Sequence, residues 1–219
     1  MLRVLVAGAR HIAVRRPELA ALVVIGMHRL LFCLVSISTL LLYRNYFTDD
    51  GAFRAGLAGL TQVLVVAAVG SVLAALLTPV VVRRVGKAAW ITAVLGAAAA
   101  AQVVFWAPYD LRWLVLGAGV IGFAGQALKI CVDTIVQESI DDAYRGRVFS
   151  VYDTVFNVAY VAAAVLAAFA VPDSGRSYLI VGVIAAGYAL TAAGYAAASR
   201  QTRRAAAAEH ASEPDPSVP

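Results

Sequence analysis

Six long apolar segments, separated by short polar breaks, dominate this sequence. A membrane-spanning helix needs about 20 apolar residues, and each segment meets that length. They cover approximately residues 19–43, 56–82, 88–107, 113–136, 148–171 and 178–199. The breaks hold turn formers and charges, and the alternation expected of barrel strands is absent. We therefore predict an all-α, polytopic integral membrane protein with six transmembrane helices.

The composition agrees with a lipid environment. Hydrophobic residues make up 62% of the 219 residues, and charged residues only 14%. A soluble domain is nearer half apolar and a quarter charged. The net charge of +5 argues little for nucleic acid, because the basic residues stand in short clusters between apolar segments. We expect the lipid bilayer as the partner, and not nucleic acid.

The distribution of Lys and Arg predicts the orientation of the chain. Of the 18 basic residues, twelve lie in the termini and breaks on one side of the predicted spans, and four lie on the other. Such an excess marks the cytoplasmic side. We therefore expect a plasma-membrane protein with both termini in the cytoplasm. Residues 1–18 read as a basic amphipathic segment, residues 19–199 as the six-helix bundle, and residues 200–219 as a disordered cytoplasmic tail.

Three polar breaks carry a family resemblance. They are Gly8-Ala9-Arg10-His11-Ile12 with Arg15-Arg16-Pro17, then Arg83-Arg84-Val85-Gly86-Lys87, and then the doubly charged stretch from Gln137 to Ser150. Together they resemble cytoplasmic loops of drug- or siderophore-efflux permeases of the major facilitator superfamily. The resemblance extends to about Arg200 and implies that the chain corresponds to the C-terminal six-helix half of a twelve-helix transporter.

The resemblance also implies a function. It suggests a secondary transporter that exports a small amphipathic molecule in exchange for protons and needs no cofactor. In this superfamily the substrate path lies between two halves, so a second six-helix half, from the same or another chain, is the implied partner. Arg83 stands where the family loop has an acid, and Pro79 where it has a glycine. The alternative is a non-transporting remnant or accessory membrane subunit from a truncated or split transporter gene.

Arg29 is the first candidate site residue. It lies about ten residues into the first predicted span, and an arginine at that depth costs at least about 2.5 kcal/mol on insertion scales. Such a residue should face the bundle interior or water. We expect it to lie on a substrate or proton path. The alternative is a structural cation bonded to a neighbouring helix.

The fourth predicted span carries a second group of polar residues. Gln126, Lys129 and Asp133 share one helical face, and the last two form an i,i+4 pair. We assign Gln126 to the substrate path. Lys129 and Asp133, with Arg145 and Arg147 in the following break, are candidates for a cytoplasmic gate. A simple salt bridge at the cytoplasmic end is the alternative for the pair.

The fifth predicted span adds Asp153 and Asn157 on one face, and we assign both to the substrate or proton path. Asp153 is a candidate protonatable residue whose charge changes as a gate opens. Its alternative role is that of an ion-pair partner for the basic residues near the cytoplasmic surface, because an acid at this depth must be paired or solvated.

Small residues and histidines complete the sequence-based expectations. Four glycines of the fourth span, Gly117, Gly119, Gly122 and Gly125, are spaced as in helices that pack closely or bend. His28 stands alone within a span, so a metal site is not expected. Neither a nucleophile motif nor a nucleotide-binding motif is evident, and we do not expect an enzyme.

Overall fold

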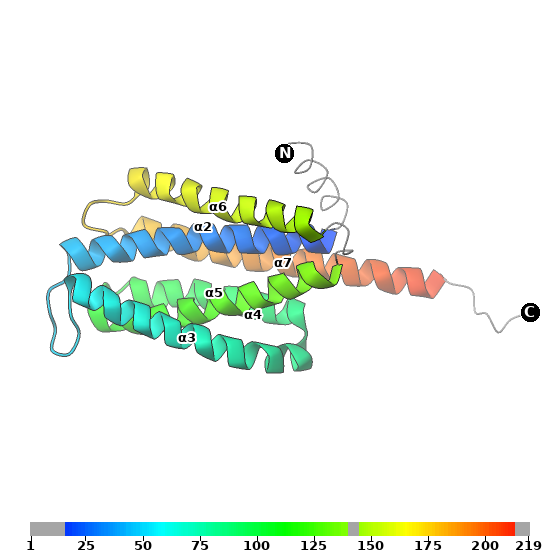
Figure 1. Cartoon of the computed structure of the whole chain (residues 1–219), viewed down its shortest axis with the longest axis horizontal. Coiled ribbons are helices and arrows are strands. Elements are labelled where there is room, and N and C mark those ends of the chain that lie inside the picture. The colour runs from blue at the N-terminus through cyan, green and yellow to red at the C-terminus, as the bar shows by residue number, and fades with distance from the viewer. Residues whose placement is uncertain (1–15, 140–144, 213–219) are drawn as a thin grey trace, which may run out of the picture.

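The computed structural model describes residues 16–139 and 145–212. Within these residues the chain forms six long helical segments that run side by side along the long axis of the molecule (Figure 1). They are α2 (Arg16–Asn45), α3 (Gly56–Val85), α4 (Lys87–Ala101) continued by the π-helical turn η1 (Gln102–Trp106), α5 (Leu111–Ser139), α6 (Arg145–Ala170) and α7 (Tyr178–Ser212). The all-α prediction with six helices is confirmed.

Length and composition allow these helices to cross a membrane. Five described segments qualify outright: Leu19–Asn45, Gly56–Val85, Lys87–Trp106, Leu111–Glu138 and Tyr178–Thr202. The described apolar part of α6 is the shorter Asn157–Ala170. Large apolar side chains cover much of the outside, and Leu57 and Phe169 are 83% and 89% exposed. An outer surface of this kind is stable only against lipid or another protein.

The helices pack in an ordered set of pairs. Each of the first three packs most extensively against one of the last three: α3 against α5, α2 against α6, and α4 against α7. If the first three helices are exchanged with the last three in order, the α2–α6 pair becomes the α5–α3 pair. These two pairs therefore occupy equivalent places in the pairing of the helices.

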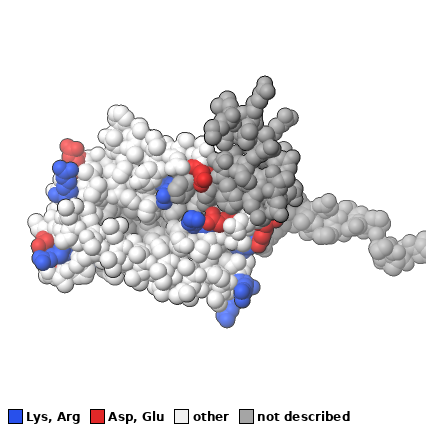
Figure 2. Space-filling view, viewed as in Figure 1, with Lys and Arg blue, Asp and Glu red and all other residues white. Residues whose placement is uncertain are grey.

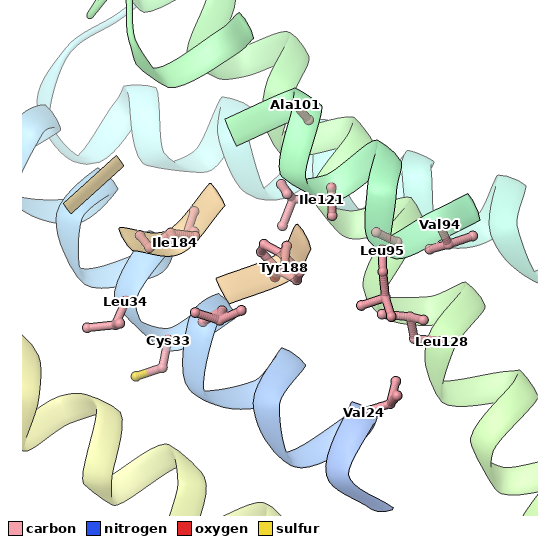
Figure 3. Close-up of a cluster of buried hydrophobic side chains, with 14 of the residues drawn as sticks. Val24, Cys33, Leu34, Val94, Leu95, Ala101, Ile121, Leu128, Ile184 and Tyr188 are labelled. Atoms are coloured by element: carbon pink, nitrogen blue, oxygen red, sulfur yellow. The ribbon is translucent and has the colours of Figure 1, made fainter. Parts of the chain in front are cut away.

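A buried apolar cluster joins the two groups of helices. Figure 3 shows Leu95 of α4 and Leu128 of α5 near Tyr188 and Ile184 of α7, with Val24 of α2 beside them. All five side chains are at most 1% exposed. This cluster fixes α2, α4, α5 and α7 relative to one another, and the remaining helices pack around it.

The C-terminal end corrects one prediction. The sequence predicted a disordered tail from residue 200, but α7 continues as helix to Ser212. The residues from Ala205 to Ala208 explain the difference, because alanine has the highest helix propensity of all residues. At the other end, the described part of α2 starts at Arg16. The predicted amphipathic segment otherwise falls in residues 1–15, outside the described residues.

The predicted third span contains a local irregularity. After Ala101 the helix widens into the π-helical turn η1, which ends at Trp106. The Trp106 indole Nε1 donates a hydrogen bond of 3.1 Å to the Thr39 hydroxyl of α2, and both side chains are buried. The π turn thus ends where the chain makes a buried polar contact with α2.

Ion pairs join loops at one end of the bundle, the end where the α2–α3 loop lies. Arg112 donates two hydrogen bonds of 3.0 Å to the Asp50 carboxylate, which gives a bidentate pair. Arg54 lies 3.4 Å from Asp49 within the same loop. The Arg112 pair joins the α2–α3 loop to the start of α5.

Arg176 links three connections at this same end. Its guanidinium carbon lies 5.4, 5.3 and 5.8 Å from the ring centres of Tyr46, Tyr109 and Tyr178. The Tyr109 hydroxyl accepts a hydrogen bond of 2.8 Å from the backbone N–H of Ser177. Burial raises the pKa of Tyr109 above its ordinary value. A single arginine thereby holds together segments that follow α2, η1 and α6.

Candidate functional site

A pocket of about 330 Å³ lies between α2, α3 and α5. Its α2 wall consists of residues at spacings of three and four, which lie on one helical face. The lining residues are Ile25, His28, Arg29, Phe32, Ala67, Ala68, Ser71, Ile121, Gly122, Gly125, Gln126 and Lys129. Three of the predicted site residues, Arg29, Gln126 and Lys129, therefore meet at one pocket. Elsewhere the surface in Figure 2 is mostly uncharged, with Lys, Arg, Asp and Glu at the two ends and in a few places between.

Glycines form the seam where α3 and α5 meet beside this pocket. A Cβ on Gly122 would lie 2.2 Å from the backbone oxygen of Ala67, and a Cβ on Gly70 would lie 2.1 Å from that of Gly119. Only glycine fits such contacts between backbones. The Ser71 hydroxyl also donates to the Gly122 carbonyl at 3.1 Å. The close packing predicted from the α5 glycines is confirmed.

Arg29 brings a positive charge into the middle of α2. The residue is partly buried and lines the pocket. Its guanidinium carbon lies 5.5 Å from the ring centre of Tyr160 on α6 and 6.0 Å from that of Phe32. Contact with aromatic faces offsets part of the cost of a charge in an apolar span. Arg29 thus links the pocket to the α2–α6 pair.

His28 is a pocket residue that sequence reasoning missed. It is 4% exposed, and its Nδ1 lies 3.2 Å from the buried Tyr188 hydroxyl of α7. Its Nε2 faces Gly125, where an added Cβ would lie 3.1 Å away. The sequence analysis noted His28 only as a lone histidine within a span and did not assign it to the site. His28 and Arg29 nevertheless both line the pocket, which has walls from α3 and α5 as well as from α2. The sequence signal that could have identified His28 was its position as a polar residue inside an apolar span.

The predicted pair on α5 is present. Lys129 Nζ donates a hydrogen bond of 2.6 Å to the Asp133 carboxylate. Lys129 lines the pocket, and Asp133 lies one turn further along α5, outside the lining. The other two gate candidates, Arg145 and Arg147, begin α6, and their side chains lie outside the described residues.

Asp153 and Asn157 lie elsewhere. Both side chains are exposed on α6, and neither is among the residues that line the pocket. The Asn157 side-chain amide donates to the Asp153 backbone carbonyl at 2.7 Å, which is a contact within the helix. The structure therefore places these two predicted path residues on a separate, exposed face.

Metal-ligating residues do not gather in the described part of the chain. Among residues 16–139 and 145–212, no group of three or more His, Cys, Asp or Glu side chains is placed to hold a metal ion. Cys33 and Cys131 are free thiols, both buried.

Comparison with known proteins relates this helical bundle to transporters. The chain is similar to proteins of Mycobacterium bovis and Mycobacterium tuberculosis, each named an uncharacterized MFS-type transporter. Each is 34% identical over 175 residues, which is 80% of this chain. These relatives support membership of the major facilitator superfamily. The chain spans only about 38% of the relatives' length. No family model matches the chain, and no solved structure does.

Proposed function

We propose that this chain is the C-terminal six-helix half of a major facilitator permease, and that the α2–α3–α5 pocket is its share of the substrate cavity. One observation carries the proposal: basic and amide side chains within apolar spans converge on a single pocket. Polar groups at such depth are costly and usually serve a transport path. The similarity to MFS-type transporters supports the same reading.

The proposed mechanism needs a second half. Transporters of this architecture bind substrate near the bilayer midplane, at the interface of two repeats or bundles, and open to either side by rocking one against the other. The pocket described here has walls from three helices of one bundle. A further six-helix bundle would complete it, supplied by a longer form of this protein, by another chain or by a second copy.

We place both termini in the cytoplasm of the cell and the cytoplasmic gate at the corresponding end of the bundle. The support is the predominance of basic residues in the connections on that side. Two ion pairs also lie towards this end, Lys129 with Asp133 and Lys87 with Glu138. Export coupled to proton entry is the proposed direction, with Asp153 as the protonatable group because it is an exposed carboxylate on a spanning helix.

Transport measured in everted vesicles from the native host tests this function. The vesicles come from a deletion strain that is complemented with the wild-type or a variant chain. They are energised by a proton gradient with an acidic vesicle interior. Uptake of a panel of small amphipathic acids, bases and neutral compounds is then recorded. We expect gradient-driven uptake of at least one compound to depend on the chain, and to be lost with Arg29→Gln and Asp153→Asn. Arg84→Gln, at the exposed end of α3, is the matched control and should restore uptake.

The alternative proposal is a non-transporting accessory membrane subunit or remnant of a transporter. It keeps the similarity to MFS-type transporters but assigns the chain no transport of its own. Vesicle uptake that is the same with and without the chain, for every compound of the panel, would support this alternative and contradict the permease.

A further inference from the structure

We propose that the seam between α4 and α7 binds the headgroup of an anionic phospholipid at one end of the bundle, in a small pocket that contains Arg200. The lining of this pocket shares no residue with that of the α2–α3–α5 pocket. The proposal therefore goes beyond the proposed function and does not depend on transport. Three features carry it: the depth of the pocket in the membrane, its charge, and its size.

The pocket lies where two candidate membrane spans end. The α4 span begins at Lys87 and the α7 span ends at Thr202, so both walls of the pocket reach the edge of the apolar region. Figure 1 shows α7 passing the α3–α4 connection at this end of the bundle. Hydrocarbon gives way to lipid headgroups at the ends of spans, so a phospholipid phosphate lies at this depth. The lining residues are Ala88, Ala89, Thr92, Ala196, Ser199 and Arg200.

Arg200 gives this pocket a positive charge. It is the charged residue of the described lining, and it is exposed. Arg204 follows one helical turn later and is also exposed. Among the described residues, neither arginine forms an ion pair with a carboxylate, whereas Lys87 beside the pocket is paired with Glu138. The guanidinium of Arg200 is therefore available to an anion that enters the pocket.

The polar groups of the pocket suit a phosphate. A guanidinium binds phosphate oxygens through two parallel hydrogen bonds. The hydroxyls of Thr92 and Ser199 donate to carbonyls of their own helices at 2.9 and 3.1 Å, and a hydroxyl hydrogen can rotate towards an anion instead. Basic pockets between membrane helices on the cytoplasmic side bind anionic headgroups, and we place this end of the bundle in the cytoplasm.

The size of the pocket favours a headgroup over a whole small molecule. Its volume of about 190 Å³ falls below the range of about 300–1,000 Å³ that is usual for small-molecule sites. The alanines of the lining leave the Arg200 side of α7 uncrowded. Ala189 and Ala193 lie on this same face of α7, deeper in the span, and both are exposed. The acyl chains of a bound lipid can lie along that face while the headgroup occupies the pocket.

Lipid binding measured by native mass spectrometry tests the site. The full chain is purified from host membranes into a mild detergent, together with any partner that stays bound. It is titrated with palmitoyl-oleoyl phosphatidylglycerol, which is anionic, and separately with phosphatidylcholine that has the same acyl chains. We expect the first molecule of phosphatidylglycerol to bind about five-fold tighter or more, because one cation near the membrane surface contributes about that factor.

Two variants separate charge from shape. Arg200→Gln should weaken phosphatidylglycerol binding about five-fold and leave phosphatidylcholine binding unchanged. Arg44→Gln, an exposed arginine near the end of the α2 span at the opposite end of the bundle, is its control and should change neither. Ala89→Leu fills the pocket without a change of charge and should also remove the preference. Ala197→Leu, exposed on α7 but outside the lining, should keep it.

Three outcomes would overturn the proposal. The first two are equal binding of the two lipids and a preference that survives Arg200→Gln. The third is a preference lost with Arg200→Gln but kept with Ala89→Leu, because the effect would then belong to the general charge of the surface and not to the pocket. Ala89 is exposed, so Ala89→Leu also serves as the deciding variant if Arg200→Gln does not fold.

Discussion

The α3–α5 and α2–α6 seams occupy equivalent places in the repeated helix pairing, yet they are built differently. At the α3–α5 seam backbone meets backbone, through Gly70, Gly119 and Gly122. At the α2–α6 seam side chains intervene, and the Arg29 guanidinium lies over the Tyr160 ring. The α3–α5 contact is also the more extensive.

The two seams therefore contribute different properties. The α3–α5 seam gives rigidity, and the α2–α6 seam carries polar side chains. Close backbone contacts gain dispersion energy but leave no room for adjustment. The looser seam admits a charge and leaves Asp153 and Asn157 exposed on α6. We infer that α3 and α5 form the fixed wall of the pocket, and that adaptable contacts are concentrated around α2 and α6. Three substitutions test this contrast, and a fourth tests the α2–α7 contact of His28, in order of decreasing effect.

The largest effect is expected from Gly122→Leu. A side chain there meets the Ala67 backbone, whose nearest atom lies 2.2 Å from the added Cβ, and a backbone cannot swing aside. The free energy of unfolding should fall by about 3 kcal/mol or more. Unfolding in mixed micelles, followed by tryptophan fluorescence, measures it. Gly96→Leu is the control, since nothing lies within 4 Å of its added Cβ. Equal stability of the two variants would refute the rigid seam.

Ala163→Leu applies the same enlargement to α6, the helix that packs against α2. Ala163 is fully buried, so the larger side chain overpacks the contact and should cost about 1–3 kcal/mol. The loss should be smaller than for Gly122→Leu, because side chains at this seam can rearrange. The same unfolding assay measures it, with Val161→Leu as a control at a position that is 61% exposed. A loss larger than that of Gly122→Leu would reverse the comparison.

Tyr160→Leu removes the ring beside Arg29 and should cost about 0.5–2 kcal/mol. Tyr160→Phe should cost less, because it keeps the ring. The Cys33 thiol contacts the Tyr160 backbone oxygen, and that contact survives both changes. A double-mutant cycle with Arg29→Gln isolates the ring–guanidinium term. A coupling of zero would show that the ring does not stabilise the charge.

Tyr188→Phe should have the smallest effect. It removes the hydroxyl that lies 3.2 Å from His28 Nδ1 and leaves the ring in place. Hydrogen bonds between membrane helices contribute about 0.6 kcal/mol on average in double-mutant cycles. We expect a loss of about that size, and no additional loss when His28→Gln is combined with it. Fully additive losses would mean that the two side chains do not interact.

Much of the fold could be predicted because it depends on local properties of the sequence. Apolar length alone located the helices, and glycine spacing alone indicated that α5 packs closely. The identity of its partner could not be predicted, because the contact of Gly122 with Ala67 depends on how α3 is placed. The extension of α7 to Ser212 was missed because the polar composition of the tail outweighed its alanine run in our reading.

The lining of the pocket was anticipated only in part. Arg29 and Lys129, which line it, could be singled out because charges within apolar spans are rare. His28 was missed because its role depends on Tyr188 and Gly125, which come from two other helices. Asp153 was expected on the same path, but helix packing places it on an exposed face away from the pocket lining.

The π-helical turn η1 behaves as a one-residue insertion in the third span. A turn of this kind holds one residue more than an α-helical turn does, and so it shifts every later side chain by about 100° around the axis. Deleting one residue of η1 would restore an uninterrupted α-helix and rotate Trp106 away from Thr39. An alignment that treats residues 87–106 as a regular helix will therefore compare the wrong faces beyond Gln102 unless it opens a gap there.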